Sequence, residues 1–136
     1  DHLRSMRLKD WEPLMRLDGV RLFSLQQNDP EHELMHCSWA ADVVDLGSLI
    51  PSPEQTAAAM AALDLVITID SFPAHLAGAH GLHAWVVLCC SPDWRWMLER
   101  DDSPWYDSLR LFRQREFGNW DAVVREVCQA IEILRG

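Results

Sequence analysis

The chain has 136 residues, of which 49% are hydrophobic and 24% are charged, a composition typical of a globular domain with a core of its own. Its formal net charge of −9 argues against a nucleic-acid-binding protein, because such a protein needs a basic face for the phosphate backbone. No stretch approaches the ~18 apolar residues of a membrane-spanning helix, and no signal peptide opens the sequence. We therefore expect no membrane span and a cytoplasmic location.

The four cysteines are predicted to be reduced thiols, most of them buried. They are Cys37, Cys89, Cys90 and Cys128, and no two of them have the Cys-x-x-Cys spacing of a redox or zinc motif. Unpaired cysteines are typical of proteins from a reducing compartment.

The first half of the chain is predicted to alternate short helices and strands. Apolar residues at helical spacing, β-branched runs and breaks at Pro or Gly decide the assignments. In chain order, the predicted elements are a helix over 10–17, a strand over 20–25, a helix over 31–39, a short strand at 43–44, and a helix over 54–63 that starts at Ser52 or Pro53.

The rest of the chain is organised around residues 64–81. This stretch begins with a short apolar run rich in β-branched residues, typical of a strand buried on both faces. Asp70 and Ser71 then supply side-chain oxygens suited to a helix N-cap, Pro73 suits the first helical turn, and Gly81 suits the C-terminal stop. The sequence therefore predicts a buried strand, a sharp turn and a helix.

The second half is predicted to add strands over 84–88 and 109–113 and a final helix that starts at Asn119 or Asp121. The residues expected to face inward from this helix are Val123, Val124, Val127, Ile131 and Leu134. Residues 91–107 are predicted to be a loop whose aromatic side chains either stack a base or sugar or form a small core of their own. Strands that alternate with helices imply parallel strands joined by right-handed crossovers.

The turn at 70–75 is a candidate anion site. Ligands of open α/β sheets bind at the carboxyl ends of the strands, where the amides and the dipole of a helix N-terminus favour negative charge. Asp70, Ser71 and the amides from Phe72 to His75 would hold a diphosphate there. The same residues are also explained as helix caps, with His75 bracing the turn as a half-buried side chain. The residues alone leave both interpretations open.

Five motifs in order carry a resemblance to a known family. They are Asp70-Ser71-x-x-x-His75-Leu-Ala-Gly-Ala-x-Gly81, Trp85, Asp93-Trp-Arg-Trp96, Ser103-Pro-Trp-Tyr106 and Arg110-Leu-Phe-Arg-Gln114. With these motifs the chain resembles the C-terminal glycosyltransferase-like module of bacterial TPR-repeat proteins, which is similar to family 9 heptosyltransferases and to O-GlcNAc transferase. The resemblance covers most of the chain.

This resemblance implies an α/β fold with a Rossmann-like parallel sheet of about five strands flanked by helices, equivalent to the C-terminal half of a GT-B glycosyltransferase. Residues 1–136 would be a single donor-binding domain for a nucleoside-diphosphate sugar. We expect it to be a fragment of a longer chain whose missing N-terminal part binds the acceptor and supplies the base, so that the fragment alone is inactive. No Asp-x-Asp occurs in the sequence, and we expect a metal-independent enzyme with no other cofactor.

The resemblance also assigns residues. Those implied to hold the donor diphosphate are Asp70, Ser71, Phe72, Ala74 and His75, with His75 as the catalytic residue near the departing charge. Those implied to line the donor cleft are Arg4, Lys9, Ser24, Gln26 and Arg95.

Other functions stay open. Phe72 and Leu82 depart from the family pattern, which favours a non-catalytic scaffold or interaction module of the same fold. The run His32-Glu33-Leu34-Met35-His36 is a literal His-Glu-x-x-His, the zinc-peptidase motif, although no third histidine follows at glycine spacing. A serine hydrolase built on Ser71 and His75 is disfavoured, because the sequence lacks Gly-x-Ser-x-Gly.

Overall fold

The computed structural model describes residues 6–26, 33–50, 52–69, 71–89, 108–116 and 118–135. The strands are β1 (Leu22–Ser24), β2 (Val43–Asp45), β3 (Val66–Ile69), β4 (Ala84–Leu88) and β5 (Leu109–Arg113). The α-helices are α1 (Glu33–His36), α2 (Pro53–Ala61), α3 (Phe72–Ala79) and α4 (Trp120–Arg135). Helices of the 3-10 type are η1 (Leu8–Arg16), η2 (Ala40–Asp42) and η3 (Gly47–Leu49). The predicted aromatic loop at 91–107 lies outside the described residues.

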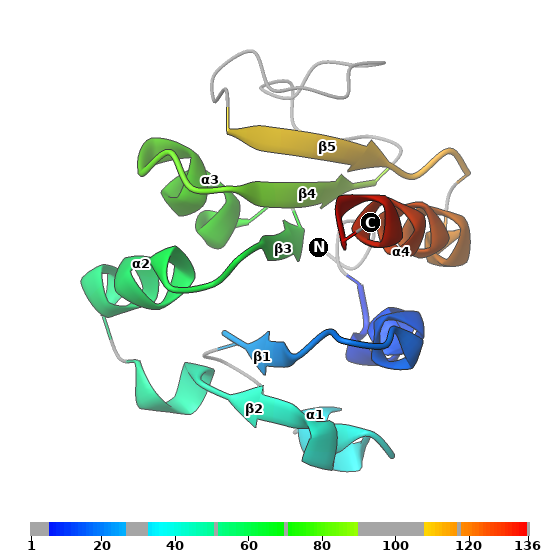
Figure 1. The fold of residues 1–136 in the computed structure, drawn as a ribbon, viewed down its shortest axis with the longest axis horizontal. Helices are drawn as coiled ribbons and strands as arrows, with labels where there is room; N and C mark the ends of the chain where they lie inside the picture. Colours follow the sequence, from blue (N-terminus) through cyan, green and yellow to red (C-terminus); the bar gives the residue numbers. More distant parts are fainter. Residues whose placement is uncertain are drawn as a thin grey trace.

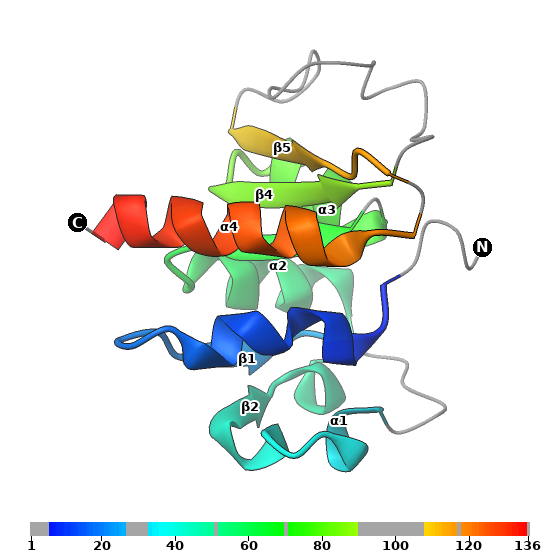
Figure 2. The same cartoon turned by 90° about the vertical axis from the view of Figure 1, so that its right-hand side faces the viewer.

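The strands form two parallel sheets. β1 pairs with β2 in one sheet, and β4 lies between β3 and β5 in the other, with Val66 opposite Ala84 and Ala84 opposite Leu109. Figures 1 and 2 place the two sheets in succession, in the order β2-β1-β3-β4-β5, with helices on both sides. The prediction of parallel strands between helices is confirmed. A single sheet of about five strands is not, because among the described residues no ladder joins β1 to β3.

β4 is the centre of the larger sheet, and all five of its residues are buried. Side chains of successive strand residues point to opposite faces, so this strand contributes to two cores. Trp85 and Val87 pack with α4 and η1, whereas Val86 and Leu88 pack with α2 and α3. A strand covered on both faces is apolar at every position, which is why its bounds were predictable.

α4 and η1 cover one face of the sheet. Val123, Val124, Val127 and Ile131 are buried there, as predicted, and Leu14 of η1 joins them. The prediction for Leu134 is wrong, because this side chain is 55% exposed. A 16-residue helix is about 24 Å long, whereas a five-residue strand spans about 17 Å. The last turn of α4 therefore extends past the sheet that buries the rest.

α2 and α3 cover the other face. The Ser52 side chain caps α2 by accepting a hydrogen bond from the Gln55 amide (3.2 Å), and Pro53 stands in the first turn, as predicted. The helix predicted over 31–39 is shorter among the described residues, ending at His36. The Cys37 and Ala40 amides donate to carbonyls three residues back, so the chain tightens into turns there.

Two composition-based predictions bear on the described residues. None of their helices is both long enough and apolar enough to cross a membrane. Cys89 is buried, Cys37 and Cys128 are half-buried, and Cys90 lies outside the described residues.

Candidate functional site

The strand–turn–helix predicted at 64–81 is present. β3 ends at Ile69, Ser71 occupies the N-cap position with extended backbone, and α3 begins at Phe72. Gly81 ends this unit with a φ of 66°, in the left-handed region that glycine enters most readily. The turn lies at the carboxyl end of β3, which is the edge where ligands of parallel sheets bind.

Two hydroxyl groups close the turn onto the end of the strand. Ser71 Oγ donates to the Ile69 carbonyl oxygen (3.2 Å), and Thr68 Oγ1 donates to the same oxygen (3.1 Å). The two hydroxyl oxygens are 3.3 Å apart. Ser71 therefore holds the N-cap position without capping the helix through its side chain. The sequence analysis missed Thr68, and its signal was a hydroxyl residue at the carboxyl end of a buried strand.

The first turn of α3 offers fewer amide donors than an ideal helix start. Pro73 has no N–H, and the Ala74 amide donates to the Ser71 carbonyl oxygen at 3.0 Å. Phe72 keeps an amide for which the described residues supply no acceptor. An anion placed here would accept a hydrogen bond from the Phe72 amide. It would also accept one from the Ser71 hydroxyl once the Ser71 side chain rotates away from the Ile69 carbonyl oxygen.

The charges at the helix starts distinguish α3 from the other α-helices. Glu33, Glu54 and Asp121 stand in the first turns of α1, α2 and α4, whereas the first turn of α3 holds no acidic residue. A carboxylate in the first turn offsets the positive end of the helix dipole. The positive end of the α3 dipole therefore has no carboxylate within the helix to offset it.

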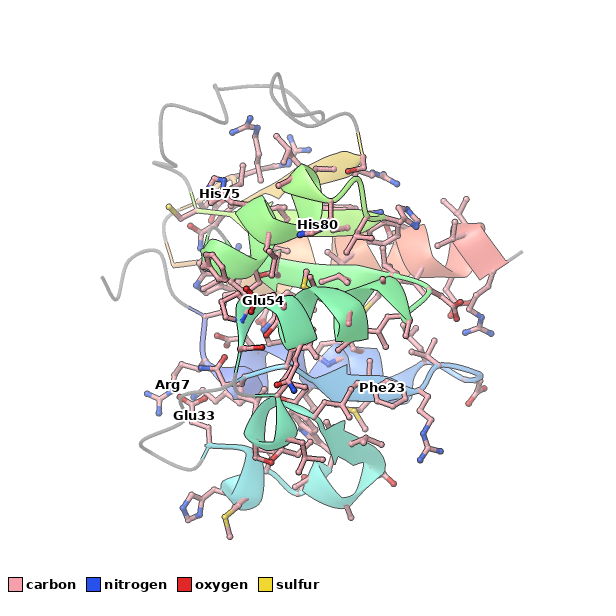
Figure 3. All side chains as sticks on the ribbon, turned by 90° about the vertical axis from the view of Figure 1, so that its left-hand side faces the viewer. Arg7, Phe23, Glu33, Glu54, His75 and His80 are labelled. Atoms are coloured by element: carbon pink, nitrogen blue, oxygen red, sulfur yellow. The ribbon has the colours of Figure 1, made fainter. Side chains whose placement is uncertain are left out.

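The residues expected to hold a diphosphate differ in how accessible they are. Phe72 is 58% exposed and Ala74 is completely buried. His75 is half-buried on the first turn of α3, and Figure 3 shows it on the same edge of the molecule as Glu54. Asp70 lies outside the described residues.

The residues expected in the donor cleft are divided between two places. Ser24 ends β1 and Gln26 lies two residues further on, and Ser24 Oγ accepts a hydrogen bond from the Gln26 amide (3.3 Å). Lys9 is exposed on η1. Arg4 and Arg95 lie outside the described residues.

The segment after β1 is packed tightly against the segment after β2. The Leu46 amide donates to the Ser24 carbonyl oxygen at 2.9 Å. Gly47 is buried directly against the Gln26 backbone, so a side chain at position 47 would meet the Gln26 carbonyl group. The two loops at this edge are thus fixed to each other through main-chain contacts.

The His-Glu-x-x-His run has a structural role in the described residues. Glu33 Oε2 accepts a hydrogen bond from the Leu8 amide at 2.7 Å, which ties α1 to the start of η1. His36 is exposed on the single turn of α1, and His32 lies outside the described residues. Within the described ranges, no three His, Cys, Asp or Glu side chains gather as metal ligands would.

A surface depression lies away from this turn. It has a volume of about 290 Å³ and is lined by Leu14, Met15, Val20, Arg21, Leu22 and Asp42. These residues surround the amino ends of β1 and β2, at the opposite edge of the strands from Ser24 and Ser71. The depression is therefore no part of the turn at 70–75.

Comparison with known proteins gives one relative of greater length. The chain is 30% identical over 128 residues to Protein FlbA of Caulobacter vibrioides, an alignment that covers 89% of this chain and 21% of FlbA. The chain thus spans about a fifth of the length of the curated relative it matches. No family model matches the chain, and no solved structure matches it.

Proposed function

We propose that the chain is the donor-binding half of a metal-independent glycosyltransferase that uses a nucleoside-diphosphate sugar. The observation that carries this proposal is the turn between β3 and α3, where Ser71 stands before a helix whose first turn lacks a carboxylate. A pyrophosphate leaving group carries negative charge that hydrogen-bond donors and a helix N-terminus stabilise without a metal. The resemblance of the five sequence motifs supports the same assignment.

The fold proposed for this function is one Rossmann-like domain of five strands, the C-terminal half of a GT-B enzyme. The order β2-β1-β3-β4-β5 in Figures 1 and 2 supports it, because a doubly wound sheet of this order binds its ligand near the junction of β1 and β3. Leu22, at the start of β1, and Leu25, directly after its end, pack against the two different cores of the larger sheet. The two sheets would thus be parts of one twisted layer.

The roles of the residues follow from this placement. Ser71 would turn its hydroxyl from the Ile69 carbonyl oxygen to a phosphate oxygen, while Thr68 keeps that carbonyl hydrogen-bonded. His75 would donate a hydrogen bond to the departing phosphate from the same helical turn. The acceptor and its base would come from another part of a longer protein, which accords with the length of FlbA.

A non-catalytic interaction module of the same fold is the second candidate. It is favoured by the shortage of donors in the first turn of α3. The Ala74 amide is already hydrogen-bonded to the Ser71 carbonyl oxygen, and Pro73 has no N–H. It is also favoured by the position of the 290 Å³ depression, which lies at the other edge of the strands.

Isothermal titration calorimetry with UDP, GDP, ADP, CDP and dTDP separates the two candidates. The transferase proposal expects millimolar or tighter binding of at least one nucleotide without added metal. Ser71→Ala should weaken it about 10- to 100-fold, the effect of one hydrogen bond to a charged group. Ser48→Ala, an exposed serine in η3, is the matched control and should bind as the wild type does. Absence of binding for every nucleotide would leave the interaction module.

A further inference from the structure

Phe72 is the first residue of α3 and stands directly after Ser71. Its side chain is 58% exposed, although an aromatic ring left in water contributes no burial energy and phenylalanine favours helix less than alanine does. Its amide has no acceptor among the described residues. One residue at the candidate site thus presents a hydrogen-bond donor and an exposed apolar ring side by side.

The ring lies on the side of α3 that faces away from the sheet. Ala74 and Ala77 are completely buried, and they mark the side of the helix that packs on the sheet. Phe72 precedes Ala74 by two residues, which corresponds to a rotation of about 200° around the helix axis. The ring therefore projects outward from the molecule, on the opposite side of the helix from the two alanines.

The direction of helical side chains carries the ring toward the start of α3. The Cα–Cβ bonds of a helix tilt toward its N-terminus, so each side chain covers surface over the turn that precedes it. Phe72 has no turn of α3 before it, and its ring therefore extends past the end of the helix. This is the space beside an anion that accepts a hydrogen bond from the Phe72 amide.

The outward position of the ring distinguishes the two ends of a bound nucleoside-diphosphate sugar. A donor-binding half holds the nucleoside against its own surface, whereas the sugar stays within reach of an acceptor on another part of the protein. The outward side of the helix start is the side that such a part can approach. A phenyl ring has no hydrogen-bonding group, and its electron-rich face attracts the weakly positive C–H groups on the apolar face of a pyranose.

We propose that Phe72 is a specificity residue whose ring stacks on the apolar face of the transferred hexose. This inference rests on the proposed transferase function and adds the part of the donor that the side chain recognises. Because the ring contacts the sugar alone, it favours binding of the donor over binding of the nucleoside diphosphate that is left after transfer.

Isothermal titration calorimetry with UDP, GDP, ADP, CDP and dTDP, and with the glucose conjugate of each, tests this contact. Glucose is a suitable probe because its ring hydroxyls are equatorial and leave the faces of the ring to C–H groups. Phe72→Ala should weaken binding of a conjugate about 3- to 10-fold, the effect of one aromatic contact, and should leave the affinity for the diphosphate unchanged.

Two further variants and a control separate stacking from a general effect of the substitution. Phe72→Tyr keeps the aromatic ring and should bind the conjugate as the wild type does. Phe72→Leu keeps apolar bulk without a flat face and should resemble Phe72→Ala. Ile133→Ala removes an 80% exposed apolar side chain of α4 and should change neither affinity. Circular dichroism confirms that each variant is folded.

The outcomes distinguish this inference from the proposed function. A wild type that binds no diphosphate and no conjugate would overturn both. A wild type that binds a diphosphate but none of the conjugates, or a Phe72→Ala variant that binds a conjugate undiminished, would overturn the sugar contact alone. An equal loss of affinity for the diphosphate and for its conjugate would place the ring on the nucleoside and would also overturn the sugar contact.

Discussion

The contact between Gly47 and Gln26 gives the sharpest test of how the sheet edge is built. In Gly47→Ala the new methyl group would meet the Gln26 carbonyl oxygen and carbon, and the amide nitrogen at 2.9 Å. These atoms belong to the backbone, so no side-chain rotation relieves the clash. Overpacking lowers the free energy of unfolding by about 1–3 kcal/mol. Because the Gln26 backbone cannot move aside as a flexible side chain would, we expect a loss at the upper end of this range. The lower entropy of the unfolded alanine chain returns about 0.4–1 kcal/mol, leaving a net loss of about 2 kcal/mol.

Thermal unfolding followed by circular dichroism measures this loss. Unfolding entropy of about 2.1 cal/mol/K per residue over 136 residues converts about 2 kcal/mol into a Tm lower by about 7 °C. Ser48→Ala also places an alanine in η3, at the exposed neighbouring position, and should move the Tm by less than about 2 °C. Equal Tm values for Gly47→Ala and Ser48→Ala would refute the packing of the two loops described here.

Three further predictions concern the core, the zinc motif and a thiol. Leu111→Ala, at a side chain 2% exposed, should lower the urea-derived unfolding free energy by about 2–5 kcal/mol, whereas Ile133→Ala, at an 80% exposed position, should change it by less than about 0.5 kcal/mol. Glu33→Ala removes the acceptor of the Leu8 amide at the start of η1 and should lower the free energy of unfolding by about 1–3 kcal/mol. Elemental analysis of the wild type should find no stoichiometric zinc. A full equivalent of zinc would contradict the structural role of Glu33. Burial, and secondarily the Glu132 carboxylate, raises the pKa of the Cys128 thiol. Iodoacetamide should therefore modify it at pH 8 more slowly than a free cysteine, and Glu132→Gln should speed the reaction. An unchanged rate in that variant would exclude the electrostatic contribution.

Several elements were predictable because their cause is local. The bounds of β4 and β5 match the predicted 84–88 and 109–113, since each is an apolar or alternating run between breakers. The start of α2 follows from Ser52 and Pro53, and Asn119 starts α4 by accepting a hydrogen bond from the Ala122 amide (3.4 Å). The turn between β3 and α3 belongs to the same group.

Other features depend on residues far apart in the chain, and no local pattern contains them. The Glu33 carboxylate binds an amide 25 positions away, which turns half of an apparent zinc motif into a link between two helices. Gly47 is required by the Gln26 backbone, and Leu134 is exposed because α4 is longer than the sheet beneath it. The division of the strands into two sheets also depends on residues far apart in the chain, because it is set by which strands pair with each other.

The candidate site shows both levels at once. The order of Ser71, Pro73 and Gly81 determined by itself that a helix starts at the carboxyl end of a buried strand, since caps and breakers act within a few residues. Only the tertiary structure decided that the segments after β1 and β2 pack against each other, with Gly47 directly against the Gln26 backbone. It also decided that the outer face of α2 and α3 has no further layer of the described chain upon it. Side-chain partners and uncovered faces depend on how the elements pack, and local residue preferences do not encode that packing.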